Sequence, residues 1–355
     1  MIPIEAETTS NAVRLTPRQC AGLALFALAV ALLVPPLWKG IEKFEPGPDY
    51  RMPYDLGYDY WLYGRRAGKA EGIPIVGDSV VWGQYVTPSQ TLSHYLNQRA
   101  GGPRFSNAGL DGSHPAALAG LLEHYGGALS GRKVVLHCNP LWMTSPRADL
   151  QDPEETKVNH PALLPQFSEK IPARRDPFSQ RLGYAIDQNV PFFGWTRHLQ
   201  LAYFGGLSVP AWTLEHPCEN PLAAITLRLP PPDDQLRHEP ISWTARGVAR
   251  QDYPWVDPGS SIQWASFRRA VDLLERRGNR LFVVVGPFNE HMLTEGSLAR
   301  YRAVRGRIEE WLRARKIPFA APPALPSDLY ADASHPLAAG YEMLARQLLE
   351  LDFFR

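Results

Sequence analysis

The sequence predicts an α/β fold in which helices cover a parallel sheet on both faces. From Ile73 onward, short apolar runs alternate with segments whose apolar residues recur at helical spacing. The connections between successive runs are long enough to cross over a sheet, as parallel strands require. Residues 281–285 are apolar at every position, which is typical of a strand that is covered on both sides. We therefore expect a three-layer α/β/α sandwich.

The expected elements follow one another in a regular order. Strands are predicted over residues 73–77, 104–107, 133–137, 281–285 and 317–320. Helices are predicted over residues 88–99, 115–129, 260–277, 298–315 and 336–349. The carboxyl ends of parallel strands meet at one edge of the sheet, and ligands bind there. Polar residues that directly follow these strands are therefore the first candidates for a functional site.

The N-terminal region combines a polar tail, residues 1–19, with an uncharged apolar stretch over residues 21–38. About 18 apolar residues are at the short end of what spans a bilayer. A cleaved signal peptide and a buried core helix are the competing interpretations. The following Pro35-Pro36-Leu37-Trp38-Lys39 is a poor cleavage site and a good interfacial anchor. We predict an uncleaved transmembrane helix over residues 20–38 that contacts the lipid bilayer, with an orientation that flanking charge leaves open.

The remaining chain divides into three parts by composition. Residues 39–72, rich in Tyr, Pro and Gly, are expected to form a linker and entry segment before a domain over residues 73–355. Within that domain, residues 141–257 do not alternate and are expected to form an insertion. A loop of this length is usually functional or disordered, and its aromatic content argues against disorder. We expect a lid or wall beside the site, whose aromatics stack on sugar rings or, as the commoner case, pack on the sheet.

Charge and cysteine content exclude several classes of function. The 355 residues carry a formal net charge of +1, with no basic patch, so no nucleic acid is expected as a partner. No Cys/His spacing suggests a metal, and no cofactor is expected. At most one disulfide, Cys138–Cys218, is possible in the domain, and a free thiol at Cys138 is the preferred alternative because it follows a buried strand.

Two motifs near opposite ends of the domain carry the chemistry. Gly77-Asp78-Ser79 follows the first strand and opens a helix, which exposes a serine hydroxyl beside helix N-terminal amides. Asp332 precedes His335 by three residues, so its carboxylate can accept a hydrogen bond from the imidazole Nδ1. The Nε2 atom is then free to take a proton from serine. Gly109 and Asn139 each follow a strand-like run between these motifs.

The Gly77-Asp78-Ser79 motif, Gly109, Asn139 and the Asp332–His335 motif, in this order, resemble the four sequence blocks of the SGNH (GDSL) hydrolase superfamily. The resemblance implies the SGNH hydrolase fold with its flavodoxin-like parallel sheet. It also implies Ser79 as nucleophile, His335 as base and Asp332 as the orienting acid. The amides of Ser79 and Gly109 and the side chain of Asn139 would form the oxyanion hole. The third block departs from the usual Gly-x-Asn-Asp, because this chain has His137-Cys138-Asn139-Pro140.

The resemblance also carries expectations about function and location. Anchored members usually act outside the cytoplasm, and the architecture looks like that of proteins in alginate acetylation and teichoic acid alanylation. A serine esterase or acyltransferase acting on O-acyl esters of an extracytoplasmic carbohydrate, first of all O-acetyl esters, is therefore expected. It would lie in the bacterial cytoplasmic membrane, with its domain on the periplasmic side and a multi-span membrane acyltransferase as partner. A non-catalytic glycan-binding or scaffold protein is the main alternative, and a lipase-like enzyme is a weaker one.

Overall fold

The computed structural model describes residues 15–54, 59–154, 158–229 and 234–354. Its centre is a five-stranded parallel sheet in the order β2-β1-β3-β4-β5. The strands are β1 (Ile73–Gly77), β2 (Phe105–Gly109), β3 (Lys133–Cys138), β4 (Arg280–Val285) and β5 (Phe319–Ala320). This confirms the predicted α/β class, and the 2-1-3-4-5 order is that of flavodoxin-like doubly wound sheets.

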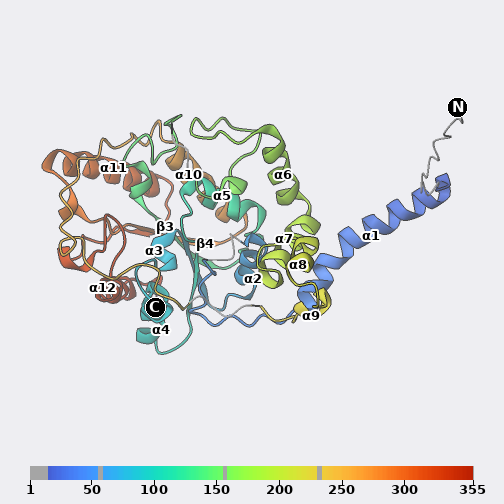
Figure 1. Cartoon of the computed structure of the whole chain (residues 1–355). Helices are drawn as coiled ribbons and strands as arrows, with labels where there is room; N and C mark the ends of the chain where they lie inside the picture. Colours follow the sequence, from blue (N-terminus) through green and yellow to red (C-terminus); the bar gives the residue numbers. More distant parts are fainter. Residues whose placement is uncertain (1–14, 55–58, 155–157, 230–233, 355) are drawn as a thin grey trace, which may run out of the picture.

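Helices cover both faces of the sheet, as Figure 1 shows. One face carries α4 (Leu92–Ala100) and α12 (Ala338–Leu349), and the other carries α2 (Tyr60–Lys69), α5 (Pro115–His124), α10 (Ile262–Arg276) and α11 (Glu295–Ala314). Strand side chains alternate between the two layers. Val135 and Val284 pack with α12, whereas Leu136 and Val283 pack with α5 and α10. The alternation follows from the two-residue period of a strand.

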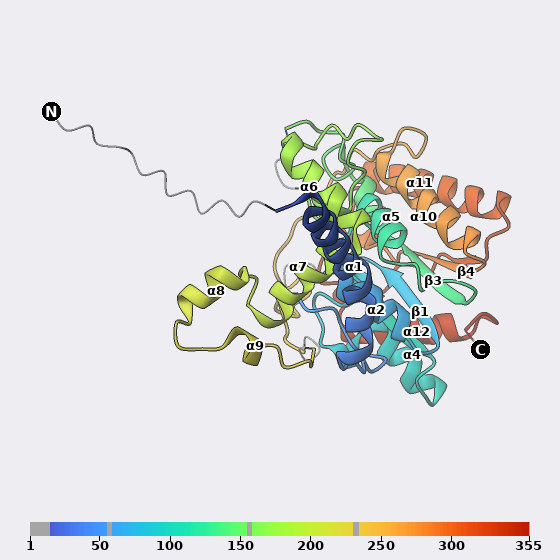
Figure 2. The same ribbon diagram turned by 90° about the vertical axis from the view of Figure 1, so that its right-hand side faces the viewer.

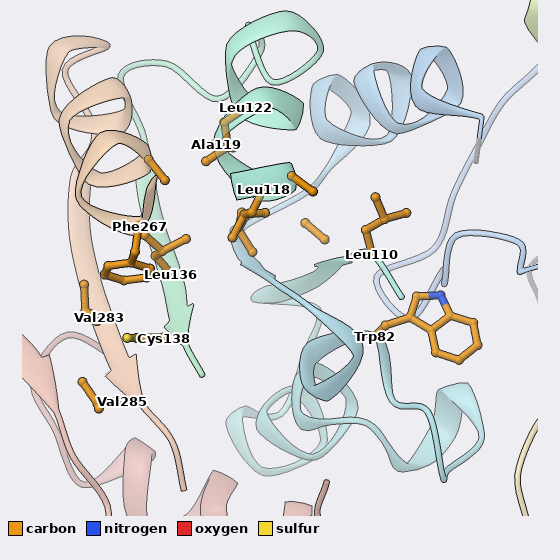
Figure 3. Close-up of a cluster of buried hydrophobic side chains, with 14 of the residues drawn as sticks. Trp82, Leu110, Leu118, Ala119, Leu122, Leu136, Cys138, Phe267, Val283 and Val285 are labelled. Atoms are coloured by element: carbon orange, nitrogen blue, oxygen red, sulfur yellow. The ribbon is translucent and has the colours of Figure 1, made fainter. Parts of the chain in front are cut away.

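The larger core cluster lies between the sheet and the α5–α10 pair. In Figure 3, Leu118 and Leu122 of α5 point toward the sheet, and Phe267 of α10 lies against Leu136 and Val283. All five side chains are almost completely buried. Burial of one such side chain contributes about 1.5–3 kcal/mol, so this layer holds the sheet and its two covering helices together.

Helix ends differ from the prediction where local backbone chemistry decides them. Helix α5 ends at His124 rather than at residue 129. The Gly126 amide donates to the carbonyl oxygens of Leu121 and Leu122, which closes the last turn before two consecutive glycines. The predicted helix over residues 88–99 is split into a 3₁₀ turn, η1 (Pro88–Gln90), and α4. The short elements α3 (Ser79–Trp82), η4 (Glu290–Met292) and η5 (Ser327–Leu329) complete the sandwich.

The entry segment is more ordered than expected. Residues 60–69 form α2, which the sequence analysis did not predict. Before α2, the fully buried Arg51 donates from Nη1 to the carbonyl oxygens of Gly83 (3.0 Å) and Val86 (2.7 Å). These carbonyls belong to the turn that follows α3. The segment therefore braces the region around Ser79 and is not a free linker.

The N-terminal apolar helix, α1 (Pro17–Ile41), is long and apolar enough to cross a membrane. It is longer than the predicted 20–38, because Thr16 caps it and residues 17–19 of the expected tail are helical. Residues 1–14 of that tail lie outside the described residues. Helix α1 projects away from the domain (Figure 1), and Pro35 is its one buried residue. A buried core helix is therefore excluded.

The region between β3 and α10 is helical rather than irregular. It contains η2 (Pro140–Met143), η3 (Pro161–Leu163), α6 (Phe178–Asn189), α7 (Pro191–Tyr203), α8 (Val209–Glu215) and α9 (Pro221–Ala224). Trp243 and Trp255 are buried in the core cluster on the sheet, as the commoner of the two interpretations of these aromatics predicted, whereas Trp212 is buried within the insertion against Phe204 and His216. The three cysteines are free, with Cys138 buried.

A close contact between α5 and η3 provides a test of this packing. A Cβ atom at Gly120 would lie 1.8 Å from the Leu163 carbonyl oxygen, so α5 would have to move. We expect Gly120→Ala to lower the free energy of unfolding by about 1–3 kcal/mol, measured by urea denaturation of the full chain in detergent. Gly127→Ala is the control, since no atom lies within 4 Å of its Cβ position. Equal stability of both variants would contradict this packing.

Candidate active site

The site begins at the sharp turn between β1 and α3. Gly77 ends β1, and a Cβ atom there would lie 2.5 Å from Val81 Cγ2 and 2.8 Å from His137 Cβ. The turn therefore requires glycine, because the strand end and α3 approach too closely for a side chain. Asp78 caps α3 by accepting a hydrogen bond from the Val80 amide (3.1 Å). Ser79 follows as the first residue of α3, at the carboxyl edge of the sheet.

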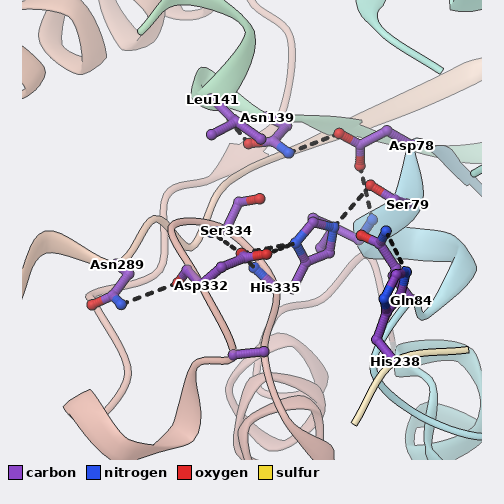
Figure 4. A network of polar contacts seen from close by, with 12 residues as sticks. Asp78, Ser79, Gln84, Asn139, Leu141, His238, Asn289, Asp332, Ser334 and His335 are labelled. Atoms are coloured by element: carbon purple, nitrogen blue, oxygen red, sulfur yellow. Dashed lines mark hydrogen bonds and ion pairs between the residues drawn. The ribbon is translucent and has the colours of Figure 1, made fainter. Parts of the chain in front are cut away.

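Ser79, His335 and Asp332 form one hydrogen-bonded chain, drawn in Figure 4. His335 Nε2 lies 2.8 Å from Ser79 Oγ, and His335 Nδ1 lies 2.8 Å from both carboxylate oxygens of Asp332. An ionised carboxylate only accepts hydrogen bonds, so Nδ1 carries the proton. The Nε2 atom is then the acceptor for the serine hydroxyl. The fold brings together two motifs that are 256 residues apart in the sequence.

The loop that carries Asp332 is held by its own backbone and by the segment after β4. Asp332 Oδ1 also accepts from the amides of Ser334 (2.9 Å) and His335 (3.0 Å). Asn289 donates from Nδ2 to the Asp332 carbonyl oxygen (3.1 Å), and its amide donates to the Ala333 carbonyl oxygen (2.9 Å). These hydrogen bonds hold the Asp332 carboxylate and its loop in place, so the orientation of the carboxylate does not depend on the His335 contact alone.

The electrostatics of the pair favour a charged Asp332 and a basic His335. Burial alone raises the pKa of Asp332, but the adjacent His335 and the two loop amides lower it well below its usual value. Burial alone lowers the pKa of His335, but the Asp332 carboxylate, with Asp78 and Asp111, raises it above its usual value. The ion pair with Asp332 therefore outweighs desolvation at the imidazole.

Asp78 is the second carboxylate of the site; unlike Asp332 it is fully buried, and it binds side chains just after the end of β3. Its Oδ2 accepts from Asn139 Nδ2 (2.7 Å) and from the Trp142 indole (2.9 Å). Its Oδ1 lies 3.4 Å from His137 Nδ1. Burial raises the pKa of Asp78, but these contacts lower it to about 2. Asp78 is therefore ionised at neutral pH and ties the Ser79 turn to the strand beside it.

Two of the predicted oxyanion donors, Gly109 and Asn139, already donate hydrogen bonds to other residues. The Gly109 amide already donates to Asn107 Oδ1 (2.9 Å), which departs from the expectation of a free donor. A Cβ atom at Gly109 would lie 2.3 Å from the Trp82 nitrogen, so close packing on α3 also explains this glycine. Asn139 donates one amide proton to Asp78 and retains the second. The roles of Ser79, Gly109 and Asn139 in an oxyanion hole stay predictions.

Three further side chains at the site were not found from the sequence. The Tyr85 ring lies 5.4 Å from the His335 ring and 5.2 Å from the His238 ring. The guanidinium of Arg246 lies 5.6 Å from the Tyr85 ring centre. His238 and Arg246 belong to an irregular segment with no periodic signal, so only the folded chain reveals their position. This end of the predicted insertion lines the site.

Asp111, in the turn after β2, is a further residue near the site that the sequence pattern did not predict. Its side chain is buried, and Oδ1 has no hydrogen-bond partner among the residues that the structure describes. Burial raises the pKa of Asp111 to about 6, although His335 opposes this shift. In turn, the Asp111 carboxylate favours the protonated form of His335. The site therefore contains a third carboxyl group within electrostatic reach of the imidazole.

Comparison with known proteins gives little further identification. No family model matches the chain, and no curated relative matches it. A solved structure of a provisionally assigned lipolytic protein of the G-D-S-L family, from Desulfitobacterium hafniense DCB-2, aligns with a TM-score of 0.32 and 10% identity. The alignment covers 78% of this chain and 95% of that chain. A likeness at this level establishes neither family nor activity.

Replacement of Asp332 tests the electrostatic coupling of the pair without any assay of activity. We expect Asp332→Asn to lower the pKa of His335, because the substitution removes the negative charge that favours the imidazolium. The measurement is an NMR titration of the His335 Cε1 proton. Asp328→Asn, an exposed carboxylate in the same loop, is the control and should leave this titration unchanged. An unchanged pKa in Asp332→Asn would contradict the assigned coupling.

Proposed function

We propose that this chain is a membrane-anchored serine esterase or O-acyltransferase that acts on O-acyl esters of an extracytoplasmic carbohydrate. The observation that carries the proposal is the hydrogen-bonded chain from Ser79 through His335 to Asp332, with contacts of 2.8 Å at both steps. A nucleophile, a base in reach of its proton and a carboxylate that orients the base are what acyl transfer through serine requires.

In the first half-reaction, His335 Nε2 takes the proton of Ser79 as the hydroxyl oxygen attacks the ester carbonyl. Asp332 holds the imidazole and stabilises the imidazolium that forms. The carbonyl oxygen becomes an oxyanion, and the Ser79 amide and the second amide proton of Asn139 are the donors we assign to it. His335 then returns the proton to the leaving alcohol as the tetrahedral intermediate collapses to an acyl-serine.

In the second half-reaction, the acyl group passes from Ser79 to an acceptor hydroxyl. His335 removes the acceptor proton, the ester to Ser79 breaks, and the serine regains its proton. Water as acceptor gives an esterase, and a sugar hydroxyl gives a transferase. Helix α1 favours the transferase branch, since an anchored enzyme meets polymer and acyl donor at one surface. The donor would then be a multi-span membrane acyltransferase.

A carbohydrate suits the groups at the site better than a lipid chain does. Tyr85 offers an aromatic face, while His238 and Arg246 offer hydrogen-bonding groups beside it. A flat ring with polar neighbours can stack on and bond to a pyranose. Together with the resemblance to anchored envelope proteins, this favours an O-acetylated polymer on the periplasmic side of a bacterial cytoplasmic membrane.

Covalent labelling tests whether Ser79 is activated. We expect one fluorophosphonate adduct on the full-length protein in detergent, and none on Ser79→Ala, by intact-protein mass spectrometry. Ser334→Ala is the control, because that buried serine lies in the same loop as His335 and its hydroxyl has no hydrogen-bond partner among the described residues. An unlabelled but folded wild type would overturn the esterase proposal and favour a scaffold. Product analysis with and without a glycan acceptor then separates esterase from transferase.

A pair of substitutions tests the role of Asn139 in the oxyanion hole. Asn139 and Trp142 both donate to Asp78 Oδ2, but only Asn139 has a second proton to offer. We expect Asn139→Ala to lower kcat about 10²–10³-fold on a chromogenic acetyl ester, as loss of one oxyanion donor does. Trp142→Phe removes the other bond to Asp78 and should cost much less. Equal losses would indicate that Asn139 acts only by positioning Asp78.

A further inference from the structure

Large apolar side chains are exposed in two parts of the described chain and almost nowhere else. Nine lie at residues 15–41, which include α1, and nine lie between residues 167 and 222. Among the described residues, Tyr54 and Leu236 are the exceptions. The second group, here called the apolar face, comprises Phe167, Phe178, Leu182, Ile186, Val190, Phe193, Val209, Leu214 and Leu222. The helices that cover the sheet expose none, so the apolar face is not a general property of this surface.

The apolar face is built on helical spacing. Phe178, Leu182 and Ile186 follow one another at intervals of four residues and form one stripe along α6. No residue of α6 is fully buried, although α6 packs against α7 and η3, and Phe178 contacts Phe167 of the same face. All three side chains of the stripe remain more than one-third exposed. Phe178 is 69% exposed and Leu214 of α8 is 84% exposed. Such side chains remain in water at a cost of about 25 cal/mol per Å² of apolar surface, which a covering partner would recover.

The apolar face lies on the side of the domain from which α1 leaves. Figure 1 shows α6, α7, α8 and α9 along the edge where α1 begins to project, and Figure 2 shows α6 and α7 next to α1, with α8 and α9 farther to one side. The opposite edge in Figure 1 carries α11. The helices that carry the two exposed apolar groups therefore lie on one side of the domain.

Packing between α1 and α7 sets the depth of this face relative to a bilayer. The residues of α1 that are not fully exposed lie at helical spacing in its second half: the partly buried Val30, Ala31, Val34 and Trp38, and the buried Pro35. The Trp38 and Trp195 rings meet edge to face with centroids 5.6 Å apart. The apolar stretch over residues 21–38 is about 27 Å long at 1.5 Å per residue, close to the thickness of a hydrocarbon core. When it spans the core, Trp38 at its end and Trp195 of α7 lie at the membrane boundary.

A buried polar cluster holds this geometry rigid. His198 of α7 bonds through Nε2 to Glu42, the C-cap of α1 (2.9 Å), and through Nδ1 to Asp59 (2.7 Å). Glu42 also pairs with Arg65 of α2 and accepts from Tyr203 of α7 (2.5 Å). Burial lowers the pKa of His198, but the two carboxylates raise it to about 9. A charged imidazole thus bridges the end of α1 to the domain.

We infer that the apolar face is a membrane-docking surface that rests on the same lipid bilayer as α1. The occupant we assign is the interfacial region of a phospholipid leaflet, into which amphipathic helices bury their apolar side by about 5–10 Å. Lipid is favoured because α7, which carries Phe193 of this face, packs on the exposed and apolar α1, and because Trp38 and Trp195 form an aromatic pair where the two helices meet. Two contacts with one bilayer fix the orientation of the domain. The inference rests on the proposed anchoring through α1 and not on the chemistry of Ser79.

Site-directed fluorescence on the full-length chain tests this surface. Leu182→Cys and Leu214→Cys are made in a Cys20→Ser, Cys218→Ser background, since Cys138 is buried. Each variant carries an environment-sensitive NBD label. Arg313→Cys, on exposed α11 at the far edge, is the control. The probes are single-protein nanodiscs and vesicles of phosphatidylethanolamine and phosphatidylglycerol, with part of the lipid carrying brominated chains.

The expected result is a blue-shifted emission and a loss of intensity to brominated lipid at Leu182→Cys and Leu214→Cys, with neither effect at Arg313→Cys. Emission like that of the control, in protein that floats with vesicles, would overturn the docking surface while leaving the anchor intact. Protein that does not float would overturn the anchor itself. A blue shift that is seen only at high protein density would assign the face to contact with a second copy of the chain. A blue shift that is seen only in native membranes would assign it to contact with another membrane protein. Either outcome would overturn the assignment to lipid.

Discussion

Parallel pairing of β1 with both of its neighbours is the constraint on which the site depends. Gly77 pairs with Gly109 on one side, and Val76 pairs with Leu136 on the other. The three strands therefore end at the same level, and the residues that follow them emerge at one edge. A shift of register would move Asn139 away from Asp78 and separate the Ser79 turn from its support. The C-terminal loop can therefore place His335 against Ser79 at this edge of the sheet.

Two carboxylates with lowered pKa values have different roles at that edge. Asp78 accepts hydrogen bonds from the Val80 amide and from Asn139 and Trp142, which follow β3. It therefore stabilises the turn that presents Ser79. Asp332 accepts from its own loop and from His335, so its charge is directed at the imidazole. Both carboxylates favour a basic His335, but only Asp332 orients it. This division gives an ordered serine–histidine contact before any substrate is bound.

The insertion has two ends with different surroundings. Its helical part, α6 to α9, lies on one side of α1, which α7 contacts, and exposes apolar side chains. Its later part contributes His238 and Arg246 beside Tyr85 and buries Trp243 against the loop of His335, where the Trp243 amide donates to the Tyr330 carbonyl oxygen (3.0 Å). One continuous segment thus connects the region near α1 with the region near Ser79. In the proposed function, this connection relates the site to the membrane that holds the acyl donor.

Local sequence patterns were enough to predict the parallel α/β class, the strands of the sheet, the apolar α1 and the two motifs that carry Ser79, Asp332 and His335. These features are local: they depend on periodicity, on a tight glycine turn or on a three-residue spacing. Only the folded chain shows that the Gly109 amide donates a hydrogen bond to Asn107 and that the Asn139 side chain donates one to Asp78. It also shows the helices of the insertion and the approach of Tyr85, His238 and Arg246. Those features depend on competition between distant partners, and a linear pattern does not record which partner a polar group will meet.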